Sequence, residues 1–237
     1  MSEDEDFVYI DNLVEGTHCI RAYYSGECRQ LPDEEFKYVI TDIRTDHETQ
    51  GEWFRKYGKD GYLIVGGDVD KQDLVKLPDY VESVTFDFGK ETIDQHRSTI
   101  ITPIDSKAMI PVSDEPNARK AFGCYFSGGV QMCPAEIRVK QNSPYTVAVY
   151  VADCDKGGRE LMIDLFDIET GHIIAPSTRV SDLDGGVYFV FTYDKSVRIL
   201  CNNLRGDNAI INAIYFDNGP VTDGINTPKN DKTNDKM

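Results

Sequence analysis

Seven side chains are of the types that could together hold a sugar. They are the aromatic residues Trp53, Tyr57 and Tyr62 and the polar residues Asp153, Asp155, Arg159 and Asn208. Aromatic faces cover the C–H surfaces of sugar rings, whereas carboxylate, amide and guanidinium groups bind the hydroxyls, often in bidentate fashion. A structural role is the alternative, because a lone tryptophan more often anchors a core and tyrosine combines an apolar body with a polar tip.

The acidic pair at 153 and 155 has two interpretations. Carboxylates at positions i and i+2 of a strand end point the same way, so they can share a cation such as Ca²⁺ or be neutralised by Arg159. The ion pair is favoured, since calcium takes six or more oxygen ligands and the loop lacks the further acids of a calcium-binding loop. A structural calcium ion elsewhere stays open, and no other cofactor is expected.

Short segments with a period of two position these residues. Apolar side chains alternate in the segments 81–88, 144–153, 160–168, 187–193 and 196–201. The segment 208–217 is apolar on both faces, which predicts a central strand, and glycine-containing turns separate the segments. The clearest helical signal is a single turn near residues 52–58. The pattern therefore predicts an all-β fold, an antiparallel and jelly-roll-like β-sandwich with little helix.

The ends of the chain differ from its middle in composition. Residues 1–6 form an acidic run and residues 218–237 are polar, so both are expected to be disordered. Residues 7–40 form an extension whose packing the sequence leaves open, and residues 41–217 form the predicted sandwich. Residues 105–118 contain two prolines and no periodicity, which predicts a surface loop or a small excursion from the sandwich.

Two passages, residues 49–66 with 77–81 and residues 153–171 with the strands after them, carry a family resemblance. They resemble a β-sandwich accessory domain, of the carbohydrate-binding-module type, that is attached to bacterial glycoside hydrolases and polysaccharide-processing proteins. The matching positions are Thr49, Gly51, Trp53, Tyr57, Gly58, Gly61, Tyr62, Pro78, Tyr80, Asp153, Asp155, Arg159, Gly185, Gly186, Tyr188, Asn208 and Ala209. Cys154 stands where that family usually has tryptophan, which removes one stacking surface. The resemblance implies glycan and a glycoside hydrolase catalytic domain as partners.

Composition excludes several other classes of function. The formal charge of −16 argues against binding to nucleic acid or to an anionic membrane surface. No apolar run is long enough for a membrane span and the acidic start is unlike a secretory signal, so the expected location is cytoplasmic, or extracellular for a fragment of an exported enzyme. The six cysteines show no zinc-binding spacing, and buried thiols are favoured over disulfides.

No catalytic motif accompanies the resemblance. The chain lacks the spacing patterns of zinc hydrolases, nucleophile elbows and phosphate-binding loops, and His47 is the one histidine kept as a functional candidate. We therefore expect a non-catalytic module that binds glycan near a glycoside hydrolase. Two alternatives are a structural module that packs against a catalytic domain without a ligand and a stand-alone glycan hydrolase.

Overall fold

The computed structural model describes residues 38–67, 73–86, 94–96, 106–109, 124–126, 132–140, 142–153 and 155–219. The chain divides into two units, residues Met1–Phe36 and Lys37–Met237, and all described residues belong to the second. The predictions for the acidic start, for most of the extension over 7–40, for most of the polar tail over 218–237 and for Cys154 lie outside the described residues. The first residue of that predicted tail, Asn218, is ordered as the last residue of a strand.

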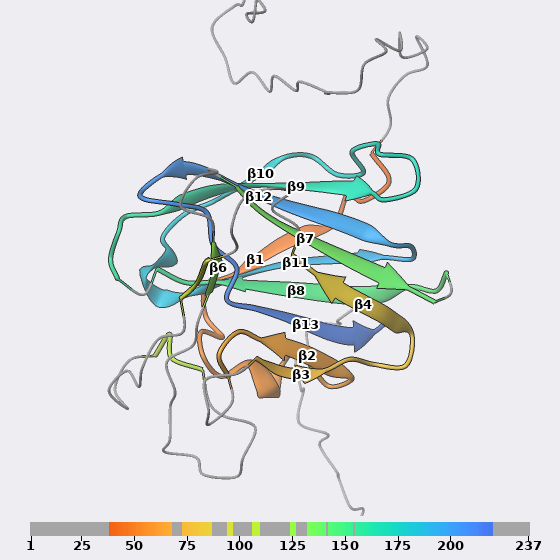
Figure 1. Ribbon diagram of the computed structural model, residues 1–237, viewed down its shortest axis with the longest axis horizontal. Helices are drawn as coiled ribbons and strands as arrows, with labels where there is room; N and C mark the ends of the chain where they lie inside the picture. Colours follow the sequence, from red (N-terminus) through yellow and green to blue (C-terminus); the bar gives the residue numbers. More distant parts are fainter. Residues whose placement is uncertain are drawn as a thin grey trace, which may run out of the picture. The chain divides into compact units, whose positions relative to one another are not determined.

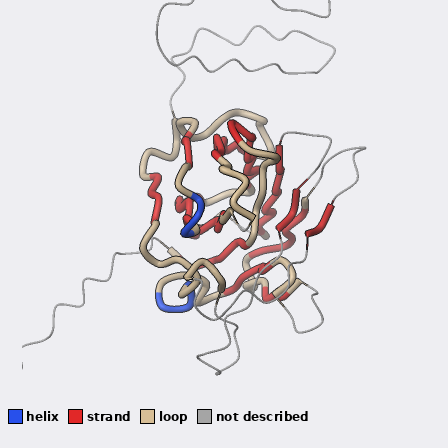
Figure 2. Tube along the Cα trace, turned by 90° about the vertical axis from the view of Figure 1, so that its left-hand side faces the viewer, coloured by secondary structure: helices blue, strands red, loops and turns tan. Residues whose placement is uncertain are grey.

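The described chain consists mainly of β-strands, with two short 3₁₀ turns, η1 (Trp53–Arg55) and η2 (Leu183–Gly185) (Figure 2). The strands are β1 (Ile43–Asp46), β2 (Gly61–Ile64), β3 (Leu74–Lys76), β4 (Val81–Thr85), β5 (Asp94–His96), β6 (Cys124–Phe126), β7 (Met132–Val139), β8 (Tyr145–Val151), β9 (Glu160–Asp167), β10 (Thr178–Val180), β11 (Val187–Tyr193), β12 (Val197–Arg205) and β13 (Ala213–Asn218).

The strands pair in two main antiparallel sheets (Figure 1). The six-stranded sheet has the order β1-β11-β8-β13-β2-β3, and the five-stranded sheet has the order β10-β9-β12-β7-β4. Strands β5 and β6 form a separate two-stranded sheet. From β7 to β9 and from β11 to β13, successive strands cross between the two main sheets, which is a feature of the expected jelly-roll path. The prediction of an antiparallel β-sandwich with little helix is confirmed.

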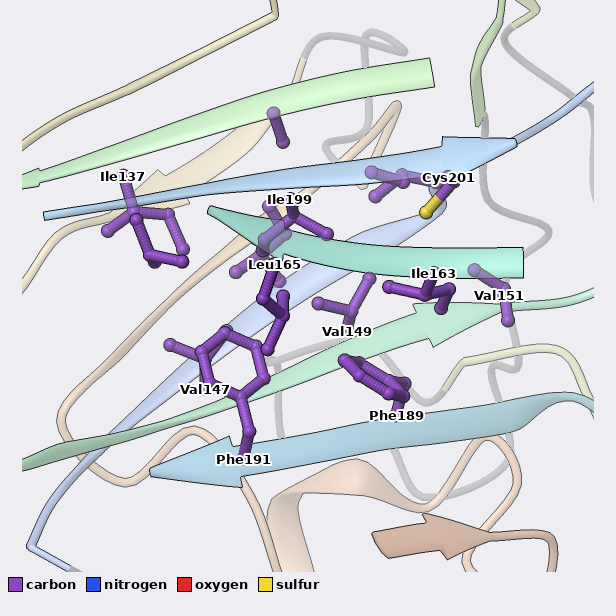
Figure 3. Close-up of a cluster of buried hydrophobic side chains, with 14 of the residues drawn as sticks. Ile137, Val147, Val149, Val151, Ile163, Leu165, Phe189, Phe191, Ile199 and Cys201 are labelled. Carbon is purple, nitrogen blue, oxygen red and sulfur yellow. The ribbon is translucent and has the colours of Figure 1, made fainter. Parts of the chain in front are cut away.

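Alternating side chains build the core between the sheets. Val147, Val149 and Val151 of β8 face Ile163 and Leu165 of β9, and all five are buried. Figure 3 shows these side chains pointing toward one another, together with residues of β7, β11 and β12. The alternation in the sequence thus marks the inner faces of the strands.

The six-stranded sheet is also apolar on its outer face. Tyr62 of β2, Tyr150 of β8, Tyr188 of β11 and Tyr215 of β13 form a second buried cluster there, with Trp53 and Tyr57 packed over them. Strand β13 lies between β8 and β2, as its two apolar faces predict. Both faces of this sheet are therefore buried. The five-stranded sheet covers the inner face, and the segment with Trp53 and Tyr57 covers the outer face.

Candidate functional site

The two motif passages meet at one end of the six-stranded sheet. Asp46 at the end of β1 pairs with Tyr188 near the start of β11, and Val187 pairs with Val151 at the end of β8. The loops that leave these strand ends therefore lie together. We call this region the loop end, and it consists of residues 47–52, 106–109, 152–159, 181–186 and 206–212, without residue 154.

The segment Ser106–Met109 connects the two passages directly. The Gly51 amide donates a hydrogen bond to the Ser106 carbonyl oxygen at 2.8 Å, and Lys107 Nζ donates one to the Asp153 carbonyl oxygen at 3.2 Å. Both passages are thus held by one four-residue segment and lie side by side.

Asp46 folds the first passage back over the sheet. Its carboxylate accepts hydrogen bonds from the Glu48 and Thr49 amides, from the Thr49 hydroxyl, from Lys56 Nζ and from the Tyr57 hydroxyl, at 2.6–3.0 Å. Burial alone would raise the pKa of Asp46, but these hydrogen bonds outweigh it and hold the pKa well below its usual range. The carboxylate therefore stays ionised and fixes the turn that brings Trp53 and Tyr57 onto the outer face.

The three predicted aromatic residues are packed inside this cover. Trp53, Tyr57 and Tyr62 are 4%, 2% and 8% exposed. The Trp53 ring stacks on the Tyr215 ring with 5.0 Å between the ring centroids, and the ring centroids of Tyr57 and Tyr188 lie 4.6 Å apart. These rings therefore cover the large tyrosines of the sheet and expose little of their own faces to solvent. The burial of Trp53 fits the alternative that this residue anchors a core. A sugar-binding role of the three rings stays a prediction.

The segment Ser106–Met109 completes the cover. The Tyr150 hydroxyl donates a hydrogen bond to the Lys107 carbonyl oxygen at 2.8 Å, and the Tyr215 hydroxyl donates one to Met109 Sδ at 2.8 Å. Lys107, Ala108 and Met109 are all buried. Of the two predictions for residues 105–118, the surface loop is wrong for this part, and the small excursion from the sandwich agrees with it. A β-carbon at Gly51 would lie 2.0 Å from the Ala108 carbonyl oxygen, which explains why glycine stands there.

The predicted polar residues do come together, around Arg159. Its Nη1 donates hydrogen bonds to Asp153, at 2.5 Å, and to Asp155, while its Nε donates to Asn208 Oδ1 at 2.9 Å. The Asp153 carboxylate also accepts hydrogen bonds from the amides of Gly157, Gly158 and Arg159 at 2.7–3.2 Å. The ion pair favoured by the spacing is confirmed.

Asp155 differs from its partners in exposure. Its side chain is 63% exposed, whereas those of Asp153 and Arg159 are 2% and 6% exposed. The hydrogen bond from Arg159 holds the pKa of Asp155 well below its usual range, and burial opposes this only in part. The pKa of Arg159 is raised, since its two acidic partners outweigh the opposing effect of burial. Asp155 is therefore an ionised, oriented carboxylate that faces solvent.

Other candidate residues do not extend this cluster. His47 is exposed, and Asp182 and Asp184 flank the start of η2, where Asp182 has a left-handed conformation with φ of 58°. Within the described ranges, no group of three or more histidine, cysteine or acidic residues is placed to hold a metal ion. Nor does the described part of the chain contain a helix long and apolar enough to cross a membrane.

Two of the cysteines face each other in the core. Cys133 of β7 pairs in register with Cys201 of β12, and both are buried thiols. Burial raises the pKa of the Cys201 thiol far above its usual range. These two residues agree with the interpretation of cysteines as small buried apolar groups.

Sequence reasoning missed Asp46 and the segment Ser106–Met109 as parts of the site. The spacing of Asp46 and Thr49 is a usable signal, because aspartate often accepts the amide hydrogen bonds of a following turn. Nothing in the sequence of residues 106–109 indicates burial, since a lysine stands among them and no periodicity surrounds them.

Comparison with known proteins gives only distant similarity. No family model matches the chain, and no curated protein matches it. Similar solved structures include a family 35 carbohydrate-binding module from Clostridium thermocellum (8% identity, TM-score 0.30, 59% of this chain and 95% of that chain). Others are a CBM35 from Cellvibrio japonicus Abf62 (10%, 0.28, 59% and 96%) and the bacteriophage CBA120 tailspike protein 4 enzymatically active domain (9%, 0.25, 56% and 18%).

Proposed function

We propose that this domain is a non-catalytic module that binds glycan at the loop end and so holds it near a glycoside hydrolase. The observation that carries the proposal is the exposed Asp155 carboxylate, which Arg159 orients where the two motif passages meet. The buried aromatic cluster has a supporting role, because the hydroxyls of Tyr150 and Tyr188 donate hydrogen bonds to the carbonyl oxygens of Lys107 and Gln50 in the loop end.

An oriented carboxylate suits the recognition of neutral sugars. Each carboxylate oxygen has two acceptor sites, so Asp155 can accept hydrogen bonds from neighbouring sugar hydroxyls while it stays paired with Arg159. Because Arg159 already fixes the side chain, little conformational freedom is lost when a sugar binds. The half-buried Asn208 adds an amide beside it.

The charge of the loop end favours a neutral sugar over an acidic one. Asp155, Asp182 and Asp184 are exposed there against one exposed lysine, Lys156, and the guanidinium of Arg159 is enclosed by its acidic partners. An anionic sugar would meet like charges at this site, whereas hydroxyl groups would meet acceptors.

The test is retention by neutral polysaccharides in affinity gels, followed by a glycan array, for the wild type and for Asp155→Asn. We expect the substitution to weaken glycan binding at least tenfold, because a neutral amide accepts weaker hydrogen bonds than a carboxylate. Asp194→Asn is the matched control, since Asp194 is exposed and follows β11 at the opposite end of that strand. Urea unfolding of both variants checks that they are folded. Equal binding by Asp155→Asn and wild type would refute the site.

A second candidate is a structural module that packs beside a catalytic domain without a ligand. The burial of Trp53, Tyr57 and Tyr62 favours it. Tyr38 and Val39, which are consecutive and exposed, offer an apolar surface for such packing. Failure of folded wild-type protein to be retained by any glycan would support this candidate over the first.

A further inference from the structure

Four arginines lie on the outer face of the five-stranded sheet, away from the loop-end site. They are Arg138 of β7, Arg179 of β10, Arg198 of β12 and Arg205 at the end of β12. The inward positions of these strands are taken by core residues such as Ile137, Val180 and Ile199, so alternation turns the arginines outward. We call this surface the arginine face.

The arginines are arranged in two triads, each around one glutamate. Glu136 accepts hydrogen bonds from Arg198 Nε at 2.8 Å and from Arg138 Nη2 at 3.0 Å. Glu160 accepts one from Arg179 and lies 3.7 Å from Arg205 Nη1. Each triad therefore carries two positive charges against one negative charge.

Exposure differs within each triad. The arginine side chains are 48–74% exposed, whereas those of Glu136 and Glu160 are 13% and 19% exposed. The glutamates thus lie beneath the guanidinium groups and orient them, and the guanidinium groups are what a ligand would meet. Exposed ion pairs contribute little to stability, so stability alone does not account for the arrangement.

The triads are separated along the strands by a row of outward residues. Arg205 pairs in register with Glu160, and Arg198 pairs with both Glu136 and Phe166. From Glu160 to Phe166 is six strand residues, or about 20 Å. Half-buried Met162, Leu200 and Asn202 lie on the same face between the two triads, together with Asp164, which is 8% exposed and accepts hydrogen bonds from Ser177 and Asn202. The arginine face is therefore an extended surface with positive charge at both ends.

We propose that the arginine face binds a linear anionic glycan, whose sulfate or carboxylate groups reach both triads at once. The inference rests on the proposed glycan-binding role of the domain but uses a different surface. Four of the six arginines whose side chains the structure describes gather here, on a chain with a formal charge of −16. Guanidinium groups bind planar or tetrahedral oxyanions in bidentate fashion, and two separated triads suit a chain better than a single sugar.

The experiment compares dextran sulfate with unmodified dextran, which share a backbone and differ in the anionic groups. We expect the wild type to bind dextran sulfate at least tenfold more tightly than dextran, with affinity falling as salt rises. The variant with both Arg179→Gln and Arg198→Gln, one change in each triad, should lose at least tenfold in dextran sulfate affinity. Arg44→Gln, on β1 of the other sheet, is the control and should bind as the wild type does.

Further arms separate the sources of the charge. Alginate tests carboxylate in place of sulfate, and poly-glutamate tests an anionic chain that is not a glycan. If poly-glutamate binds as tightly as dextran sulfate, the ligand is not specifically a glycan and the proposal is wrong. If the double variant binds dextran sulfate as tightly as the wild type does, the arginine face is not the binding surface. If neutral glycans are retained through Asp155 while dextran sulfate is not, the arginine face fails and the loop-end site stands.

Discussion

Replacing Arg159 with glutamine tests the polar cluster at the loop end. The substitution leaves the Asp153 carboxylate, whose side chain is 2% exposed, without its cationic partner. Removing one partner of a buried ion pair costs about 3–5 kcal/mol. Three backbone amides still donate to Asp153, so we expect a loss near the lower limit, about 3 kcal/mol in the free energy of unfolding. For a domain of this size, that corresponds to a decrease of roughly 6–12 °C in the melting temperature.

The assay is urea unfolding followed by circular dichroism, with the free energy extrapolated to water. Arg179→Gln is the control, because Arg179 forms an exposed pair with Glu160 and its loss should cost no more than about 1 kcal/mol. The double variant with Asp153→Asn and Arg159→Gln should recover part of the loss, since the buried carboxylate is then neutral. If Arg159→Gln lowers the free energy of unfolding as little as the control does, the argument that the ion pair is shielded from solvent is refuted.

Two further predictions concern a glycine beside the buried cluster on the outer face and three tyrosines of the core between the sheets. Gly186→Ala should prevent folding or destabilise the protein severely, because its β-carbon would lie 1.9 Å from the Tyr150 hydroxyl oxygen. Gly171→Ala, whose β-carbon would have no atom within 4 Å, should cost only the strain of its φ of 70°, about 1–2 kcal/mol. Soluble yield and urea unfolding compare the two variants, and equal losses of stability would contradict the steric argument. Burial raises the pKa values of Tyr80, Tyr145 and Tyr193 above the usual value near 10, so their contribution to stability is complete below pH 10 and is lost as the pH rises above it. In a pH titration, tyrosinate absorbance should then appear together with unfolding. Ionisation of all tyrosines at pH 10 in folded protein would contradict this prediction.

The sandwich could be predicted because its strands obey a simple physical rule. Alternation in 160–168 and 187–193 reflects one face buried in the core, and the two apolar faces of 208–217 reflect a central position. The structure corrects the boundary of that last strand, since β13 begins at Ala213 and residues 208–212 belong to the loop end. Strands β2 and β3 are only four and three residues long, and so short a stretch shows little periodicity.

The candidate site was predictable in part. The ion pair of Asp153 and Arg159 follows from local spacing within one strand end and its loop. The burial of Trp53 does not, because it depends on Tyr215, which is far away in sequence, and on a sheet face whose neighbours only the pairing register defines. The arginine face could not be predicted from the sequence either, because its four arginines come from three strands and no local motif contains them.

The excursion that leaves β4 and returns at β7 has a consequence for engineering. These two strands are neighbours in the five-stranded sheet, so a tight hairpin could connect them without changing that sheet. Such a shortened protein would lack Ser106–Met109, and the tyrosine hydroxyls of the opposite sheet would lose the acceptors that now satisfy them. The connection is therefore dispensable for the five-stranded sheet but needed to bury the aromatic side chains on the six-stranded sheet. Deleting it would expose those rings to solvent as an apolar patch that is prone to aggregation.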